Sequence, residues 1–154
     1  MNEIAILKDL DHPNIASLHE IHETENTIYL IMDHIQGKTL QELFFKSNFA
    51  QRYTEEEIMC LLYSILDSLA YLASKGIMHR DLKPANILIE KEGGVKLVDF
   101  GFATYINEPE FILKICGSPG YLAPEVFEYD EKIPETRYND RCDVFSAGCI
   151  FFRM

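Results

Sequence analysis

Two carboxylates, an amide and a lysine lie close together in the middle of the chain. Asp81, Lys83 and Asn86 belong to the run HRDLKPAN, and Asp99 opens the triplet Asp-Phe-Gly a short distance downstream. Carboxylate and amide oxygens suit hard divalent cations, and an ammonium group suits phosphate oxygens. Because Mg²⁺ usually takes one or two carboxylates together with substrate phosphates, these residue types indicate metal-assisted phosphate chemistry.

A β-hairpin must bring these groups together. The apolar runs 87–89 and 95–98 are joined by Lys-Glu-Gly-Gly, and Gly-Gly between two such runs is a hairpin signal. The hairpin turns the chain back on itself. We therefore expect the three oxygen-bearing residues to converge near the ends of its strands.

The motifs in this region resemble those of a known family. The pattern H-R-D-L-K-P-x-N followed by D-F-G is similar to the catalytic core of the eukaryotic protein kinases. Ala123-Pro124-Glu125 lies downstream, as it does in that family, and the order and spacing of the motifs together argue against a chance match. Lys83 and the segment Gly117–Glu125 match the serine/threonine branch rather than the tyrosine branch.

The resemblance assigns a role to each polar residue of the centre. Asp81 would orient the substrate hydroxyl and accept its proton, and Lys83 would stabilise the transferring phosphoryl group. Asn86 and Asp99 would be the metal ligands, and these two residues and Lys83 would also hold ATP. Ser118 would hydrogen-bond Asp81 and Lys83. The implied cofactors are ATP and Mg²⁺, and the implied partners are proteins that carry serine or threonine.

The resemblance also places a nucleotide pocket. Glu3 would pair with an ATP-positioning lysine, Met32 would be the gatekeeper, and Asp33 and Ile35 would belong to the hinge that grips adenine. Leu88 would lie beneath the base. Simpler readings remain open: Glu3 is also typical of a solvated helix face, and Met32 is also typical of ordinary packing.

Composition sets broader limits. The 154 residues are 47% hydrophobic and 25% charged, as expected for about one globular domain, and the net charge of −11 argues against nucleic-acid binding. No run approaches the roughly 18 apolar residues of a membrane span, and no signal peptide opens the chain. The four cysteines lack C-x-x-C spacing, which favours reduced thiols and an intracellular location, in the cytoplasm or alternatively in the nucleus. The oligomeric state stays open.

Periodicity predicts the main elements. The clearest helix starts at the capping box formed by Thr54 and Glu57 and ends before Gly76. A second helix is expected over 2–10, and two strands over 15–21 and 27–33 with a turn between them. Residues 126–142 are predicted to form an acidic surface loop.

A buried helix is expected from Asp143, whose carboxylate would accept backbone N–H groups of the catalytic loop. Its buried residues would be Val144, Phe145, Ala147, Ile150 and Phe151. In active kinases an apolar stack links the elements around the site, and the matching residues are Leu7, Leu18, His79 and Phe100. A second stack would use Leu40, Ile87, Leu88, Ile89, Ile150 and Met154.

The predicted fold class is α+β, a protein-kinase-like fold that is incomplete. Residues 1–33 would be the remnant of the small lobe, 34–38 the hinge and 39–154 part of the mainly helical large lobe. The chain carries neither a Gly-rich loop nor a V-A-I-K lysine. By itself the chain is therefore expected to be weakly active or inactive, and the alternative is a non-catalytic, kinase-like binding module.

Regulation by loop phosphorylation is not expected. Kinases commonly dock a phosphorylated threonine of the loop 102–116 on the arginine of H-R-D, which is Arg80 in this chain. Lys114 occupies the matching loop position, and Thr104 and Tyr105, the only hydroxyl residues of the loop, lie too near Asp99. Arg80 would then face a like charge, solvent or another acidic group.

Overall fold

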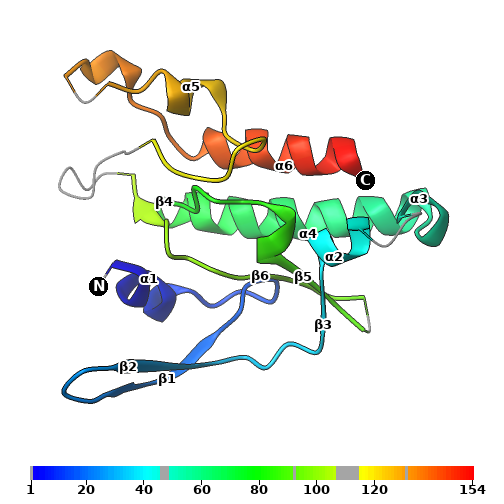
Figure 1. The fold of residues 1–154 in the computed structure, drawn as a ribbon, viewed down its shortest axis with the longest axis horizontal. Coiled ribbons are helices and arrows are strands. Elements are labelled where there is room, and N and C mark those ends of the chain that lie inside the picture. The colour runs from blue at the N-terminus through cyan, green and yellow to red at the C-terminus, as the bar shows by residue number, and fades with distance from the viewer. Residues whose placement is uncertain (1, 46–48, 92, 107–114, 131) are drawn as a thin grey trace.

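The computed structural model describes residues 2–45, 49–91, 93–106, 115–130 and 132–154. Figure 1 shows the helices α4 (Glu55–Ser74) and α6 (Arg141–Arg153) side by side, with β5 and β6 on the opposite side of α4. The other elements are α1 (Asn2–Asp9), β1 (Leu18–Glu23), β2 (Ile28–Met32), β3 (Gly37–Thr39), α2 (Leu40–Phe45), α3 (Phe49–Arg52), β4 (Ile77–Met78), β5 (Ile87–Glu90), β6 (Val95–Leu97), β7 (Thr104–Tyr105) and α5 (Pro124–Phe127).

The hairpin predicted over 87–98 is confirmed. Strands β5 and β6 pair antiparallel, with Ile87 opposite Leu97. Strand β3, which lies partly within the stretch predicted as a hinge, pairs with the other edge of β5. That pairing needs a glycine at position 37, because a Cβ there would lie 2.2 Å from the Ile89 carbonyl oxygen.

The first two strands exist, but their predicted bounds were wrong. We expected 15–21 and 27–33, whereas β1 begins at Leu18 and β2 begins at Ile28. The segment before β1 pairs elsewhere: the Ala16 N–H donates to the Leu97 carbonyl at 3.0 Å, and Ile15 forms a parallel bridge with the same residue. A contact with β6, remote in sequence, therefore sets the start of β1.

Helix α4 follows its local signals closely. The Thr54 hydroxyl accepts from the Glu57 N–H at 3.2 Å, and the Glu57 carboxylate accepts from the Thr54 N–H at 2.7 Å. The helix ends before Gly76, whose φ of +68° suits glycine. Its buried face carries Leu61, Ile65, Ser68, Leu69 and Leu72. The leucines and the isoleucine of this face belong to the main hydrophobic cluster.

Helix α6 is only partly buried, which corrects the prediction. It begins at Arg141 rather than Asp143, and Ala147 and Ile150 are buried as expected. Three other residues expected in the core are exposed: Val144 (52%), Phe145 (43%) and Phe151 (46%). Within the described residues α6 packs on α4 and, through Cys142, on a second apolar cluster, so only its remaining face meets solvent.

The stretch expected to be a surface loop contributes to a core. Val126, Tyr138 and Cys142 are buried in a second apolar cluster with Met78 and Ala123. Short helical turns lie at both Pro124–Phe127 and Pro134–Thr136. The acidic composition of this stretch hid the buried residues within it.

By length and composition alone, α4 could also cross a membrane. The core helix of a globular domain passes the same test, and the buried residues of α4 belong to the main hydrophobic cluster. This finding is weak support for a membrane span.

Candidate active site

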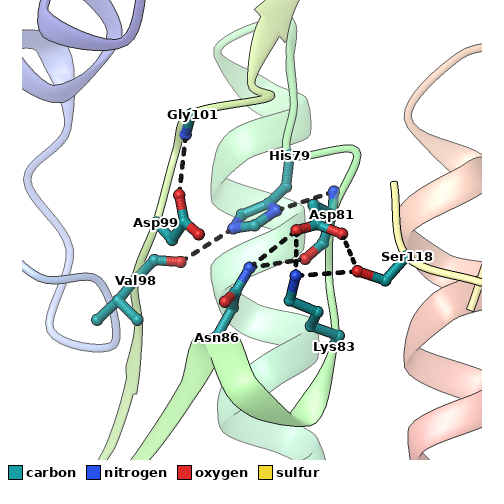
Figure 2. Close-up of polar contacts among 8 residues, drawn as sticks. All are labelled: His79, Asp81, Lys83, Asn86, Val98, Asp99, Gly101 and Ser118. Carbon is teal, nitrogen blue, oxygen red and sulfur yellow. Dashed lines mark hydrogen bonds and ion pairs between the residues drawn. The ribbon is translucent and has the colours of Figure 1, made fainter. Parts of the chain in front are cut away.

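The Asp81 carboxylate is the centre of a compact polar network (Figure 2). Its Oδ2 accepts from the Lys83 ammonium at 2.7 Å, and its Oδ1 accepts from the Ser118 hydroxyl at 2.8 Å. Lys83 also donates to the Ser118 oxygen at 2.9 Å, which closes a three-membered ring of interactions. The Asp81 side chain is only 2% exposed, so these protein donors largely replace water around its charge.

Asn86 adds a further donor from the short helical turn before β5. Its Nδ2 donates to the Asp81 carbonyl at 3.0 Å and lies 3.3 Å from the Asp81 Oδ2. The amide nitrogen is used by these contacts, so the amide oxygen is left as a candidate ligand. Pro84 at the start of the turn favours this local conformation.

A buried carboxylate on α6 holds the catalytic loop in place. Asp143 accepts from the backbone N–H groups of His79 at 2.7 Å and Arg80 at 2.8 Å. Burial raises the pKa of the Asp143 carboxyl, and His79 and the N–H donors oppose that shift. The predicted contact between Asp143 and the loop is confirmed.

The imidazole of His79 connects the loop to the strand that leads to Asp99. Its Nε2 lies 3.3 Å from the Val98 carbonyl, and its Nδ1 accepts from the Asp81 N–H at 3.3 Å. The His79 and Phe100 rings lie 5.0 Å apart, and both residues are buried. The predicted stack is therefore present at these two residues and at the buried Leu7, with Leu18 packed against the same cluster.

Six of the predicted nucleotide residues line one cleft. Its volume is about 280 Å³, and Leu7, Ala16, Val98 and Phe100 complete its lining. The six are Glu3, Met32, Asp33, Ile35, Leu88 and Asp99. A lining of apolar residues with a few charged groups is typical of a site for a small organic ligand with a charged part.

Comparison with known proteins agrees with this geometry. The family described as protein kinase domain matches residues 1–154, which is the whole chain. The chain belongs to the protein kinase family. The kinase fold is also found by structure: the yeast RNA Pol II CTD kinase CTDK-1 complex contains a chain similar at a TM-score of 0.83 and 28% identity, over 97% of this chain and 47% of that one.

Several similar curated proteins are named serine/threonine-protein kinases. The kinase cds1 of Schizosaccharomyces pombe is 35% identical over 99% of this chain, and human ULK1 is 37% identical over 98%. Mouse DCLK3 is 36% identical over 98% of the chain. The chain spans 33% of cds1, 14% of ULK1 and 18% of mouse DCLK3. It therefore matches only part of each of these kinases.

Asn86 and Asp99 are the residues that the family resemblance assigns to Mg²⁺. Among the described residues no group of three or more His, Cys, Asp or Glu side chains could hold a metal ion. Asn86 and Asp99 nevertheless offer oxygen ligands of the kind Mg²⁺ prefers, and phosphates complete such a site. Asp99 is exposed and its Oδ1 accepts from the Gly101 N–H at 3.3 Å. The donor set fits the metal.

Asp33 has a structural task at the edge of the cleft. Its carboxylate accepts from the Ser17 N–H at 3.0 Å and lies 2.8 Å from the His19 imidazole and 3.5 Å from the Lys96 ammonium. The Ser17 hydrogen bond, with His19 and Lys96, lowers the pKa of Asp33 although burial opposes the shift. This carboxylate is thus engaged within the protein.

The Arg80 side chain is bonded within the protein, whereas the sequence led us to expect that it faces a like charge, solvent or an acidic group. Its Nε donates to the Phe102 carbonyl at 2.7 Å and its Nη1 donates to the Tyr138 hydroxyl at 3.3 Å. Sequence reasoning missed Tyr138, because it lies in the stretch interpreted as a solvated loop. Lys114, expected opposite Arg80, lies outside the described residues.

Proposed function

We propose that this chain is the central part of a protein serine/threonine kinase domain. It would transfer the γ-phosphoryl group of ATP to serine and threonine hydroxyls of protein substrates. The single observation that carries the proposal is the buried Asp81 carboxylate, which is bonded to Lys83, Asn86 and Ser118.

The network supports a specific role for each of its side chains. Asp81 orients the incoming hydroxyl and takes its proton as the oxygen–phosphorus bond forms and the bond to the leaving ADP breaks. Lys83 supplies a fixed positive charge next to Asp81 for the oxygens of the moving phosphoryl group. Ser118 locks both side chains, so little reorganisation is needed during transfer.

The cleft supports ATP as the phosphoryl donor. Met32, Ile35 and Leu88 offer apolar surface for a flat base, and Asp99, the one carboxylate of the proposed metal pair, lies among the lining residues. Bound Mg²⁺, held by Asn86 and Asp99, would neutralise phosphate charge. Lys83 and Asn86 lie outside the lining of the cleft, next to the position expected for the reacting phosphate.

The similar proteins support the proposed class of substrate, and the cysteines support the proposed cellular location. The similar curated proteins named above are serine/threonine kinases, so we propose hydroxyl substrates of that class. All four cysteines carry free thiols, which agrees with an intracellular location.

The test compares Asp81→Asn with the wild type in the intact natural protein that contains this chain. We expect phosphate transfer from ATP to a mixed serine/threonine peptide library in the wild type, and a loss of at least about 10³-fold in the variant. Asp140→Asn, which changes a carboxylate outside the network, serves as the matched control and should keep full activity.

Two results would contradict the proposal. Equal activity of Asp81→Asn and the wild type would remove Asp81 from the mechanism. A wild type that binds partners normally but transfers no phosphate would favour the kinase-like binding module instead.

A further inference from the structure

We propose that Tyr138 is a positioning residue for phosphoryl transfer: its hydroxyl holds the Arg80 side chain, which fixes the Asp-Phe-Gly turn relative to Asp81. The inference rests on the proposed kinase function and extends it to a residue far from the motifs in sequence.

Arg80 joins three segments of the chain. Its backbone N–H donates to the Asp143 carboxylate at 2.8 Å, which ties it to α6. Its guanidinium donates from Nε to the Phe102 carbonyl at 2.7 Å and from Nη1 to the Tyr138 hydroxyl at 3.3 Å. Arg80 directly precedes Asp81, and Phe102 directly follows the Asp-Phe-Gly turn. The side chain therefore connects the catalytic loop with the segment that carries Asp99.

Both ends of this connection are under backbone strain. Arg80 has a φ of 65° and Asp99 a φ of 64°, and within the described ranges they are the two non-glycine residues with positive φ. Such conformations persist only where the surroundings impose them. The guanidinium supplies such a restraint, because it bonds from the strained residue Arg80 to the segment just beyond Asp99.

Tyr138 is well suited to anchor the guanidinium. It is 5% exposed and packs in the second apolar cluster, with Tyr129 edge-on at a ring distance of 5.8 Å. Burial raises the pKa of Tyr138 to about 12 although Arg80 opposes the shift, so the hydroxyl stays neutral at physiological pH. A rigid, neutral oxygen can then accept from Arg80 under all ordinary conditions.

This anchor needs no covalent modification of the neighbouring loop. Residues 106–117 contain no serine, threonine or tyrosine, so that stretch offers no hydroxyl to be phosphorylated. Tyr138 instead provides an oxygen that is built into the core. Arg80 is thus held against Phe102 and Tyr138 without phosphorylation of that stretch.

The experiment compares Tyr138→Phe with Tyr129→Phe in the intact protein. Both substitutions remove one phenolic oxygen from the same cluster, but only Tyr138 bonds Arg80. For Tyr138→Phe we expect kcat to fall about tenfold, as for the loss of one hydrogen bond to a charged group. We also expect a rise in the Mg²⁺ concentration needed for half-maximal rate, because Asp99 is less well placed, and a peptide KM within about twofold of the wild type. Tyr129→Phe should leave all three values unchanged.

The same substitution in an Arg80→Met variant distinguishes an effect of Tyr138 on Arg80 from a general effect on the packing of the cluster. In Arg80→Met, the Tyr138→Phe substitution should change kcat by less than about twofold, because its effect passes through the missing guanidinium. A Tyr138→Phe enzyme with wild-type kcat and Mg²⁺ dependence would overturn the inference. So would a tenfold loss that persists in the Arg80→Met background.

Amide hydrogen exchange tests the role of Tyr138 even if the protein proves not to be a kinase, because it does not depend on turnover. If the wild type transfers no phosphate, the function is wrong, and amide hydrogen exchange still tests Tyr138. Residues 79–83 should then exchange faster in Tyr138→Phe than in Tyr129→Phe. Equal exchange in the two variants would overturn the positioning role.

Discussion

Removal of the Ser118 hydroxyl should weaken catalysis in a protein that still folds. The hydroxyl donates to Asp81 at 2.8 Å and accepts from Lys83 at 2.9 Å. In Ser118→Ala the carboxylate loses one of its donors, and because the Asp81 side chain is 2% exposed, solvent replaces it poorly. A hydrogen bond to a charged group contributes about 1.5–3 kcal/mol. We take about 2 kcal/mol, which corresponds to about a 30-fold lower kcat.

The assay is steady-state phosphate transfer by the intact protein, with kcat and KM measured separately for ATP and peptide. Ser118→Thr is the matched control, since it keeps the hydroxyl at the same branch point and should retain most of the activity. The free energy of unfolding of the Ala variant should fall by no more than about 2 kcal/mol, because the folded state loses the same hydrogen bond to the Asp81 carboxylate while Lys83 still donates to it.

The reasoning is refuted if Ser118→Ala keeps kcat within about twofold of the wild type. It is refuted equally if Thr and Ala are impaired alike, because the loss would then reflect the shape of the segment rather than its hydroxyl. A rise in the KM for ATP alone would show that the residue acts on nucleotide binding and not on Asp81.

Three further outcomes concern stability. Asp143→Asn should lower the free energy of unfolding by about 2–3 kcal/mol in urea titrations, because one of two buried N–H groups loses its acceptor, while Asp140→Asn should change it little. Thr54→Ala should cost about 1 kcal/mol through loss of the α4 cap, and Thr54→Ser should restore most of it. Because the pKa of Tyr138 is raised from 10.0 to about 12, its contribution is complete below pH 10 and is lost as the pH rises through 12. Over that range the wild type should lose about 3 kcal/mol more than Tyr138→Phe in pH-dependent unfolding, because each pKa unit corresponds to about 1.4 kcal/mol; parallel curves would contradict this.

Some of the fold follows from the sequence because its causes are local. The α4 cap depends on Thr54 and Glu57, three residues apart, and the β5–β6 hairpin depends on the glycines between two apolar runs. The polar residues around Asp81 come from one short motif, so their types and spacing were enough to predict a phosphate site. Ser118 was assigned through the family resemblance, and the structure places it on Asp81.

Other features depended on partners remote in sequence. The start of β1 is set by the pairing of residues 15 and 16 with β6, and periodicity within the strand carries no information about that partner. The exposure of Phe145 and Phe151 likewise depends on which side of α6 meets α4. An apolar helix pattern shows only that some face can be buried.

By itself, the sequence of this member of the protein kinase family determined the chemical groups of the site and the short elements that carry them, because hydrogen-bonded caps, turns and motifs act over a few residues. Only the tertiary structure decided how Arg80 is held. Its partners Phe102 and Tyr138 are brought to it by packing of the Asp-Phe-Gly segment and the start of α6. No local rule relates a buried tyrosine in an acidic stretch to an arginine of the catalytic loop, because that contact exists only once the two segments have folded against each other.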